Sequence, residues 1–521
     1  MTSLATKRLL FAGILFFGLL AMTARTATDP DLWWHLRTGQ WIVETGHVPH
    51  ADPFSFTRGG TAWVSHEWLS ETIFYELWKH LDPGALIVFS SLITTAGFLL
   101  LYARCQAKAH WAAALTVLGA AAAAFSWGAR PQMFTFTLAS LLLWLLEQAE
   151  ARPRLLLCIP ALFLLWLNLH AGFALGPALL LLYAIGLFFE AAAGTTPWPR
   201  ARLIATRVLL ITLACLALVP LNPSGAQLYR YPLDTLRSTG MRTFIVEWFS
   251  PNFHRSLYFP FLFVVLLLLV ALTYSRSRVK GRILLPLLFT AAAAFDAVRH
   301  IPIFILLAIP VVAAAVPNPL TSPPLPQSLT VRRRKPAMFY AAALVLLALF
   351  SIVRWIDLAR AQPAREAELF PEKAIAFLQI TPQPERLFAF YDWGGYAIWK
   401  LDSKYRVFAD GRADLYGNDL LRQTIQTVVQ LHQGWAQVLD HWNVQTILIP
   451  PGSALAQALL LDPRWKASYR DSQAVVFVRA SPANQGHRIE SLNILKKSLL
   501  DPARICETRG ALEKVLGSRG S

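Results

Sequence analysis

The sequence predicts a polytopic α-helical membrane protein with a C-terminal extracytoplasmic α/β domain. Three observations support this fold class: 55% of the residues are hydrophobic, only 15% are charged, and long apolar stretches recur over most of the chain. Soluble domains usually contain about 25% charged residues, so the deficit indicates a chain largely removed from water. The four cysteines are scattered without a CxxC pair, which gives no support to a disulfide framework or a zinc site.

The apolar stretches define the expected membrane spans. A spanning helix needs roughly 20 mainly apolar residues, and on this criterion we expect about eleven transmembrane helices. They lie near 9–23, 85–103, 111–126, 133–149, 155–169, 173–190, 205–221, 257–274, 283–297, 301–316 and 337–353. The first stretch follows Lys7 and Arg8 and also has features of a signal peptide. We interpret it as an uncleaved first span because many further spans follow.

The basic residues predict the orientation of these spans. With the N-terminus in the cytoplasm, the inner loops hold Lys7, Arg8, Arg104, Lys108, Arg152, Arg154, Arg200, Arg202, Arg207, Arg276, Arg278, Lys280, Arg282, Arg332, Arg333, Arg334 and Lys335. Cytoplasmic loops are enriched in Lys and Arg, so we expect a multi-pass protein of the plasma (inner) membrane with its C-terminal domain outside. The net charge of +17 is then explained by orientation signals, and nucleic-acid binding has no support.

The expected domain organisation follows from these spans. Residues 1–358 form a transmembrane domain with a large first outer loop over 24–84. Residues 359–480 form the α/β domain, and 481–521 form a polar tail. In the α/β domain, "RLFAFY", "YRVFAD", "VQTILIP" and "QAVVFVRA" are typical of strands, and the segment from Gly417 to Trp442 is typical of a helix pair. This alternation predicts a partly parallel sheet.

Polar residues capable of chemistry gather on the predicted outer side. They are Asp29, Asp31, His35, His66, Glu67, Arg130, Asn168, His170, Glu247, His254, Asp296, Arg299 and His300. No ionisable residue lies near the middle of an expected span, and intramembrane charges usually mark conduction or transport pathways. The pattern therefore indicates a site at the outer membrane surface.

The first outer loop predicts two helices. Asp29 before Pro30 is a good helix start, with Asp as N-cap and Pro as the first helical residue, and Gly46 is a typical stop. Tryptophans at 33, 34 and 41 favour a helix that lies along the membrane surface. A second helix is expected after Ser65, ending at Asp82, Pro83 and Gly84.

Several motifs together resemble a known family. The stretches "DPDLWWHLRTGQWI", "VPHADPFSF" and "WVSHEWL" in a first outer loop, followed by many spans and an outer domain, are similar to the GT-C superfamily of membrane glycosyltransferases. That superfamily includes oligosaccharyltransferase catalytic subunits, protein mannosyltransferases and lipid A aminoarabinose transferases. "FYDWG" resembles the WWDYG motif with which oligosaccharyltransferases recognise acceptor peptides, matching it at Asp392 and Gly394. The chain departs from those enzymes in the second outer loop, where "SWGARPQMF" contains no DxE motif.

The resemblance implies a glycosyltransferase that moves a sugar from a polyprenyl-phosphate donor to a glycan, lipid or protein acceptor at the outer face of the membrane. It implies contact with membrane lipids and, as a candidate cofactor, a divalent Mg or Mn ion. The expected catalytic residues are Asp31, Glu67 and His35, with Asp31 as general base or metal ligand. The expected substrate-binding residues are Arg130, His170, Arg299, His300, Asp392 and Asp410.

Structural roles remain open for the same residues. Asp29 can serve only as a cap, Asp31 as a solvated acid, Glu67 and His66 as helix-start residues, and Arg299 as an anchor beside lipid headgroups. His170 can be a packing histidine, and the Asp392 and Asp410 segments can be packing or turn motifs. Two other classes of protein also remain: a multi-pass transporter or flippase of lipid-linked saccharides, and a non-catalytic membrane assembly protein.

Overall fold

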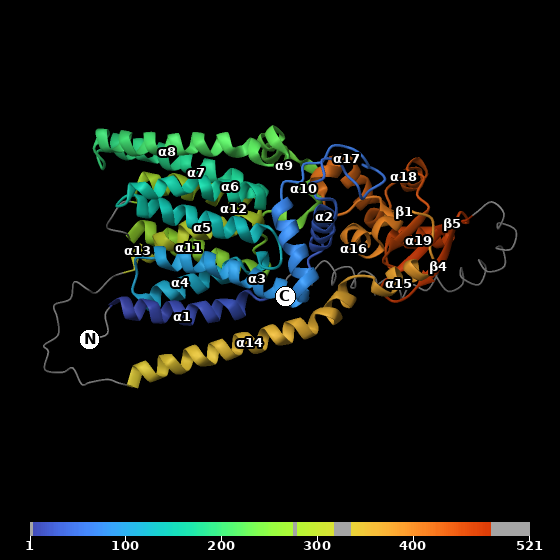
Figure 1. The fold of residues 1–521 in the computed structure, drawn as a ribbon, viewed down its shortest axis with the longest axis horizontal. Coiled ribbons are helices and arrows are strands. Elements are labelled where there is room, and N and C mark those ends of the chain that lie inside the picture. The colour runs from blue at the N-terminus through green and yellow to red at the C-terminus, as the bar shows by residue number, and fades with distance from the viewer. Residues whose placement is uncertain (1–3, 275–278, 317–334, 481–521) are drawn as a thin grey trace. The chain divides into compact units, whose positions relative to one another are not determined.

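The computed structural model describes residues 4–274, 279–316 and 335–480, and the chain divides into two compact units (Figure 1). Unit 1 comprises Met1–Ala27, His66–Asp234 and Val246–Gln362, and unit 2 comprises Thr28–Ser65, Thr235–Ile245 and Pro363–Ser521. Much of the first outer loop therefore groups with the C-terminal part of the chain. The proline-rich stretch 317–327, the expected tail 481–521 and the basic residues Arg276, Arg278 and 332–334 lie outside the described residues.

Unit 1 is built from helices. They are α1 (Leu4–Thr23), α3 (Trp68–Arg104), α4 (Ala109–Ala122), α5 (Gln132–Ala149), α6 (Ile159–Leu169), α7 (Leu175–Ala192), α8 (Trp198–Leu218), α11 (Phe259–Tyr274), α12 (Gly281–Asp296), α13 (Ile301–Ala315) and α14 (Lys335–Leu369), which continues into unit 2. A short helix, α9 (Tyr231–Arg237), crosses the boundary between the units. Short 3₁₀ turns, among them η2 (Pro153–Cys158), η3 (Ala171–Ala174), η6 (Val246–Trp248) and η8 (Val298–His300), connect or extend the helices.

Each of the predicted apolar stretches falls on one of these helices or on a helix with its adjoining 3₁₀ turn. Within the described ranges, 6 helical segments are long and apolar enough to cross a membrane: Trp68–Arg104, Ala171–Ala192, Trp198–Leu221, Ser256–Tyr274, Val298–Ala315 and Phe339–Leu369. Shorter apolar helices cover Arg8–Thr23, Ala109–Ala122 and Pro153–Leu169. The chain is thus a membrane protein of mainly helical structure, and the full number of spans stays a prediction.

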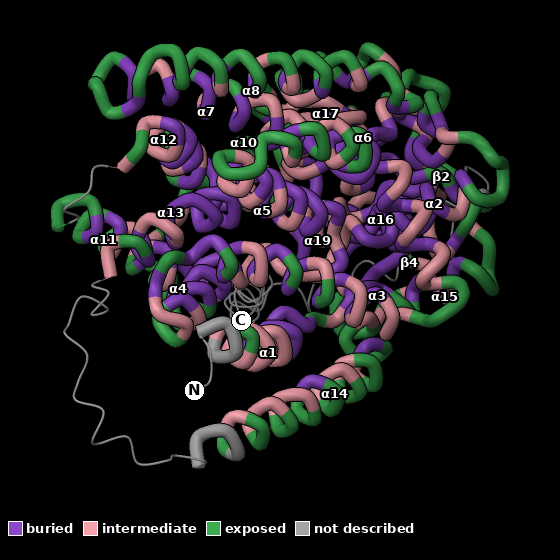
Figure 2. Tube along the Cα trace, turned by 60° about the vertical axis from the view of Figure 1, so that its left-hand side comes forward, coloured by how far each residue is buried: buried purple, intermediate pink, exposed green. Residues whose placement is uncertain are grey.

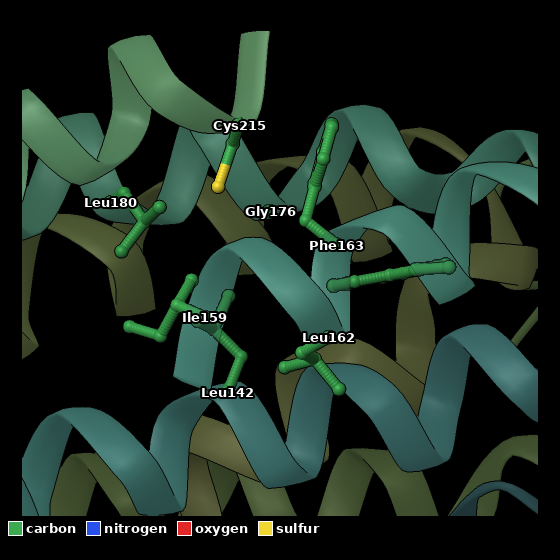
Figure 3. Close-up of a pocket in the computed structure, with 8 residues that line it drawn as sticks. Leu142, Ile159, Leu162, Phe163, Gly176, Leu180 and Cys215 are labelled. Atoms are coloured by element: carbon green, nitrogen blue, oxygen red, sulfur yellow. The ribbon is translucent and has the colours of Figure 1, made fainter. Parts of the chain in front are cut away.

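The helices of unit 1 pack through small and branched side chains. α7 packs against α8 and α12, and α3 packs against α5. Where α5, α6, α7 and α8 meet, an apolar void of only about 10 Å³ remains, with Leu142, Phe163, Leu180 and Cys215 among the side chains around it (Figure 3). A space of this size without polar partners does not hold a stable water molecule, so the bundle is closely packed at this point. By contrast, α8 and α14 expose long stretches to their surroundings (Figure 2).

The second helix of the first outer loop joins the next span directly. α3 begins at Trp68 and continues to Arg104, with a break at Asp82, where φ is 71°. The Asp82 carboxylate accepts a hydrogen bond from the Gly84 backbone N–H at 2.5 Å, as an Asx turn does. The predicted stop at Asp82 is therefore a kink between two helical segments.

Unit 2 contains a five-stranded sheet in the order β2-β1-β3-β5-β4. The strands are β1 (Arg386–Ala389), β2 (Arg406–Val407), β3 (Thr446–Ile449), β4 (Trp465–Arg470) and β5 (Val475–Arg479). β1 pairs in parallel with β2 and β3, whereas β5 is antiparallel to β3 and β4. This confirms the partly parallel sheet. β4 was not predicted: its sequence WKASYR has no β-branched residue, and Lys466 and Arg470 are exposed on this edge strand of the sheet.

The helices of unit 2 surround this sheet. They are α2 (Leu32–Thr45), α10 (Thr239–Phe244), α15 (Glu372–Ile380), α16 (Tyr391–Leu401), α17 (Ala413–Ile425), α18 (Trp435–His441) and α19 (Ala454–Leu461). The core contains Phe388, Phe408, Ile447, Trp465 and Phe477, which are at most 2% exposed. α17 and α18 match the predicted helix pair, with a π-helical turn at Gln426–Gln430 between them.

Two of the three tryptophans of α2, Trp33 and Trp34, are buried in unit 2. The Trp33 ring lies 5.3 Å from that of Phe370 and 4.9 Å from that of Tyr396, and Trp33 is 0% exposed. α2 packs against α16. The interpretation of Trp33 and Trp34 as interfacial residues was therefore wrong, since tryptophan is equally suited to a protein core, where it buries a large apolar area.

The segment that follows α2 extends the edge of the sheet. Ser55 forms a parallel bridge with Val407, and the Phe56 N–H donates to the Val407 carbonyl oxygen at 3.1 Å. The Thr57 hydroxyl donates to the Phe408 carbonyl at 2.5 Å. Backbone pairing along β2 therefore holds this part of the first outer loop within unit 2.

Candidate functional site

Glu67 forms the centre of a polar cluster in unit 1. It precedes α3 as its N-cap residue, and its Oε1 lies 3.1 Å from Nε2 of His66 and 3.4 Å from Nε2 of His170. The three side chains are no more than 10% exposed. The His66 ring also lies 4.2 Å from that of Tyr231. The structure thus brings together two predicted residues, Glu67 and His170, with two further polar groups.

The hydrogen bonds of His170 fix the tautomer of its imidazole. Nδ1 lies 2.9 Å from the Gly172 backbone N–H, which can only donate, so Nδ1 is an acceptor and Nε2 carries the proton toward Glu67. The Thr135 hydroxyl lies 2.7 Å from the same Nδ1 and accepts from the Trp166 indole N–H at 2.8 Å. A Cβ at Gly172 would lie 2.3 Å from the Thr135 Oγ1, so only glycine fits this turn. His170 is therefore an oriented donor to a carboxylate.

Two arginines converge on one carboxylate in the same unit. Arg130 Nη1 forms an ion pair with Glu247 Oε1, and the Gln132 amide donates to the other carboxylate oxygen at 3.4 Å. The Arg299 guanidinium lies 4.5 Å from the centre of the Trp248 ring. Arg299 also interacts electrostatically with Glu247, Arg130, Tyr231 and Glu67, which links the arginines to the Glu67 cluster.

Glu247 is held in its ionised form. Removal from water raises the pKa of Glu247, but the positive charges of Arg130 and Arg299 and the hydrogen bonds from Arg130 and Gln132 lower it more. The result is a pKa of about 2, below the ordinary value of 4.5. The Glu247 side chain is 30% exposed and that of Arg130 is 14% exposed. Both groups of this ion pair therefore remain accessible to an anion that competes for the arginine.

His300 lies beside this pair of arginines. Its Nδ1 is 3.1 Å from the Ala293 carbonyl oxygen, which only accepts, so Nδ1 is protonated. Its ring centre is 6.2 Å from that of Trp248. Among the predicted substrate-binding residues, unit 1 therefore holds Arg130, His170, Arg299 and His300.

The N-terminus of α2 in unit 2 carries the two aspartates of the first outer loop. The Asp29 carboxylate accepts a hydrogen bond from the Asp31 backbone N–H at 3.0 Å, and the Asp29 carbonyl accepts from the Leu32 N–H at 3.1 Å. The helix itself begins at Leu32 with Asp31 as its N-cap residue, so the predicted start at Asp29 and Pro30 lies one turn too early, and Asp29 stabilises the turn before the helix. Gly46 ends the helix with φ of 72°, and its N–H donates to the Ile42 carbonyl at 2.9 Å, the predicted stop.

The Asp31 carboxylate lies against backbone that follows two strands. A Cβ placed on Gly411, just after β2, would lie 2.0 Å from Asp31 Oδ1, and the same oxygen accepts from the Trp34 indole N–H at 3.3 Å. A Cβ placed on Gly395 of α16 would lie 3.1 Å from the Pro30 carbonyl oxygen. The glycines of "YDWGG" and "ADGRAD" therefore allow the start of α2 to approach the carboxyl ends of β1 and β2.

Tyr391 begins α16, directly after β1, in the same region of unit 2. Burial and the charges of Asp31, Asp410 and Asp392 raise the pKa of Tyr391 well above 10.0. Its buried hydroxyl has no hydrogen-bond partner within the described ranges. Tyr391 therefore keeps its proton at neutral pH and has an unused donor close to the Asp31 carboxylate. Asp392 lies in the first turn of α16, where a negative charge is favoured by the helix dipole.

The structure corrects the assignment of Asp410 as a substrate-binding residue. The Asp410 carboxylate is 0% exposed and accepts from Arg412 Nε at 2.8 Å, Arg412 Nη2 at 2.7 Å and the Tyr416 hydroxyl at 2.8 Å. Arg412 Nη1 in turn donates to Asp52 Oδ1 at 2.8 Å. A carboxylate with its oxygens bonded inside a core has no capacity left for substrate, so its role is structural.

His35 was also predicted as catalytic and is only 3% exposed. Its ring centre lies 3.6 Å from that of Trp34, and its backbone N–H donates to the Asp31 carbonyl at 3.2 Å. The His35 ring is thus enclosed beside Trp34, and its catalytic role stays a prediction.

A divalent metal ion would need several side-chain ligands close together. The described part of the chain holds no group of three or more His, Cys, Asp or Glu side chains arranged to bind a metal ion, around Asp31 or elsewhere. The Asp31 carboxylate is instead contacted by Trp34 and the Gly411 backbone. The contacts of Asp31 do not fit a Mg or Mn site, since such an ion takes several oxygen ligands.

Sequence reasoning assigned no role to Glu247, Tyr231 or Tyr391. Glu247 stands in the segment between α10 and α11, more than a hundred positions from Arg130, so nothing local in the sequence indicates their pairing. For Tyr391, its place as the last residue of the predicted strand "RLFAFY" was an available signal, since ligands bind at the carboxyl ends of parallel strands.

The chain shares its fold with solved structures of an archaeal oligosaccharyltransferase. The structure of the archaeal oligosaccharyltransferase AglB from Archaeoglobus fulgidus, in complex with an inhibitory peptide and a dolichol-phosphate, is similar with a TM-score of 0.55, 11% identity, and coverage of 84% of this chain and 69% of that chain. The Archaeoglobus fulgidus oligosaccharyltransferase tethered to an acceptor peptide with the NVT sequon has a TM-score of 0.54 and 12% identity, covering 91% and 74% of the two chains.

A weaker similarity links the chain to ArnT from Cupriavidus metallidurans bound to undecaprenyl phosphate, with a TM-score of 0.47, 15% identity, and coverage of 92% and 99%. No protein-family model and no curated protein matches the sequence. At 11% and 12% identity, the two oligosaccharyltransferase structures establish a shared fold, in agreement with the fold that the resemblance implied.

Proposed function

We propose that the protein is a glycosyltransferase that moves a sugar from a polyprenyl-phosphate donor to an acceptor at the outer face of the membrane. The observation that carries this proposal is the convergence of Arg130 and Arg299 on Glu247 in the membrane unit. Guanidinium groups match phosphate geometry and neutralise the charge that develops on a departing phosphate. The GT-C fold supports this use, because the related AglB structure contains a dolichol-phosphate.

Glu247 keeps the arginines in place before the donor binds. It is ionised at neutral pH, because its pKa is about 2, and it balances one of the two positive charges. A lipid phosphate with greater charge competes for the exposed side of Arg130. Glu67 and His170 adjoin this group, with Nε2 of His170 oriented as a donor, and we assign them to binding the sugar or the phosphate.

Asp31 is the proposed general base. Direct displacement at the anomeric carbon forms the new glycosidic bond and breaks the bond to the phosphate oxygen, and the acceptor hydroxyl or amide must lose a proton. The Asp31 carboxylate accepts that proton, while the unpartnered Tyr391 hydroxyl donates a hydrogen bond to the acceptor. The phosphate leaves as an anion and needs no general acid. Asp392 is proposed to bind the acceptor.

The location follows from the basic loops. We propose a plasma (inner) membrane protein with a cytoplasmic N-terminus and the α/β domain outside. The glycan, lipid or protein nature of the acceptor does not alter the roles given to Asp31 and Arg130.

The test separates donor binding from transfer. Purified full-length protein in vesicles is assayed for binding of undecaprenyl phosphate and for transfer of labelled sugar from lipid-linked donors. Arg130→Gln and Arg299→Gln should weaken binding at least tenfold, whereas Arg255→Gln, an exposed arginine without a side-chain partner in the described ranges, should not. Asp31→Asn should leave binding intact and reduce transfer roughly 10²–10⁴-fold.

Asp29→Asn is the matched control for Asp31, because an Asn amide oxygen can still accept the hydrogen bond from the Asp31 backbone N–H. Equal binding by all arginine variants would contradict the phosphate assignment. Full transfer by Asp31→Asn would contradict the base assignment, and a dead Asp29→Asn would show that the two aspartates have the opposite roles.

A further inference from the structure

A second feature of unit 1 lies on a different set of elements from the candidate site. An open cavity of about 170 Å³ is bounded by α5, η2, α7 and α8. One face of α8 forms a wall, with Arg200, Leu203, Ile204, Arg207 and Val208 at the i, i+3, i+4, i+7 and i+8 positions. The facing walls come from Leu146, Ala149 and Glu150 of α5, Leu156 of η2 and Tyr183 of α7.

The charges around this cavity are unbalanced. Arg200 and Arg207 are exposed, and neither guanidinium has an ion pair or hydrogen bond within the described ranges. The acidic group of the wall, Glu150, is already paired with Arg282 at 3.1 Å and Lys280 at 3.3 Å. Arg282 has a second carboxylate partner in Glu190, to which its Nε donates at 2.9 Å. Since these two carboxylates and two cations balance, Arg200 and Arg207 leave an excess positive charge.

The rest of the wall is apolar and continues into a surface that faces the lipid. Leu203, Ile204 and Val208 line the cavity. Farther along α8, Leu210 is 60% exposed and Leu213 is 62% exposed. Because α8 lies in a segment apolar enough to span the membrane, these exposed leucines suit contact with lipid. A ligand of this cavity therefore needs an anionic group for the arginines and an apolar chain for the remaining surface.

We propose that this cavity binds an anionic glycerophospholipid, with its phosphate between Arg200 and Arg207 and an acyl chain along α8. The arginines are seven positions apart, so their Cα atoms are about 10 Å apart along the helix, and both long side chains can reach one headgroup. Basic pockets between helices at a membrane surface suit such headgroups. The arginines also belong to the basic loops predicted to be cytoplasmic, so the lipid comes from the inner leaflet. This proposal is independent of the proposed enzyme activity.

The test measures lipid-dependent stability of the full-length protein in detergent. Dioleoylphosphatidylglycerol should raise the unfolding midpoint in a saturable manner, and dioleoylphosphatidylcholine should not, because only a ligand that binds the folded state shifts the equilibrium. Arg200→Gln with Arg207→Gln should raise the lipid concentration needed for half of the effect at least tenfold. Arg154→Gln with Arg202→Gln is the matched control, since it removes two exposed arginines of the same predicted side that do not line the cavity.

Further variants and ligands identify what binds in the cavity. Arg200→Lys with Arg207→Lys keeps both positive charges and should retain most of the stabilisation by phosphatidylglycerol. This variant separates a loss of lipid binding from a loss of folding. Three results would overturn the proposal: an equal loss in the control pair, equal stabilisation by glycerol phosphate or inorganic phosphate, or a stronger Arg200-dependent and Arg207-dependent effect of undecaprenyl phosphate than of phosphatidylglycerol.

Discussion

The Asp31 carboxylate lies directly against the backbone of Gly411, so that a Cβ at position 411 would be 2.0 Å from Asp31 Oδ1 and 2.8 Å from the Trp34 indole nitrogen. Asp31 and Gly411 are close only in the folded protein, because most of the chain separates α2 from the end of β2. The environment of the proposed base is therefore set by the outer unit as much as by the helix that carries it.

Gly411→Ala should displace Asp31 and reduce transfer. The added methyl group cannot fit without a shift of the carboxylate, and overpacking of this kind costs roughly 1–3 kcal/mol of unfolding free energy. Thermal unfolding and sugar transfer would be measured together. Gly18→Ala is the control, because a Cβ at Gly18 meets nothing within 4 Å. Unchanged activity in Gly411→Ala would show that the position of Asp31 is not critical.

Tyr391→Phe should lower transfer without lowering stability. The buried hydroxyl has no hydrogen-bond partner in the described ranges, so its removal relieves an unsatisfied polar group and leaves stability unchanged or slightly higher. Transfer falls if this hydroxyl binds the acceptor, and the effect should lie mainly in KM for the acceptor. A large loss of stability would indicate that Tyr391 is instead a structural donor.

Asp410→Asn should lower the stability of the protein, whereas Asp392→Asn should weaken recognition of the acceptor. Removing the charge of Asp410 leaves Arg412 with only part of its buried ion-pair network, at a cost of roughly 3–5 kcal/mol. Asp392 is partly exposed, and its substitution should weaken acceptor use while the unfolding midpoint changes little. Equal destabilisation by the two substitutions would favour a packing role for Asp392.

Glu247 should contribute stability with a defined pH dependence. Because the pKa of Glu247 is lowered in the folded state to about 2, its contribution is fully present above 4.5 and is lost as pH falls toward 2. Glu247→Gln should therefore lower the unfolding midpoint at pH 7, and the difference from the unmodified protein should shrink from pH 4.5 to pH 2. Glu385→Gln, an exposed position, should show no such trend. A difference that persists unchanged at pH 2 would exclude the Arg130 ion pair as its source.

Reporter fusions should place the α/β domain outside the cytoplasm. The excess of Lys and Arg in alternate loops predicts this side. A phosphatase that is active only outside should be active when fused after residue 360 and inactive when fused between α3 and α4, near Ala107. The opposite pattern would move every proposed outer residue to the cytoplasmic side.

Helices and most strands were predictable because their signals are local. A run of apolar residues forms a helix in a membrane whatever its neighbours are, so each predicted stretch falls on helical structure. The Gly46 stop was equally local and is confirmed, whereas the helix start was predicted at Asp29 and the structure has Asp31 as the N-cap residue. β1, β3 and β5 were identified by their aromatic and β-branched residues.

The site was less predictable because it depends on distant contacts. Asp410 follows a strand and looked accessible, yet Arg412 and Asp52 enclose it in the core. The tryptophans of α2 were interpreted from residue type alone, whereas Phe370 and Tyr396 decide their environment. Similarly, Arg130 was identified as a phosphate partner without Glu247, because a separation of 117 positions conceals their ion pair.

The ion pair between Asp52 and Arg412 also imposes an order on biosynthesis. The two residues are 360 positions apart, so α2 and the segment after it emerge early and lack their partners until nearly the whole described chain has been made. Until then Asp52 has no arginine and Trp33 has no Phe370 or Tyr396 to contact. Contacts between residues so far apart in the chain form slowly, and until they form the apolar side chains of α2 stay exposed. Assembly of the outer unit should therefore be post-translational, and a chain shortened before residue 412 should leave its N-terminal segment as a target for chaperones and proteases.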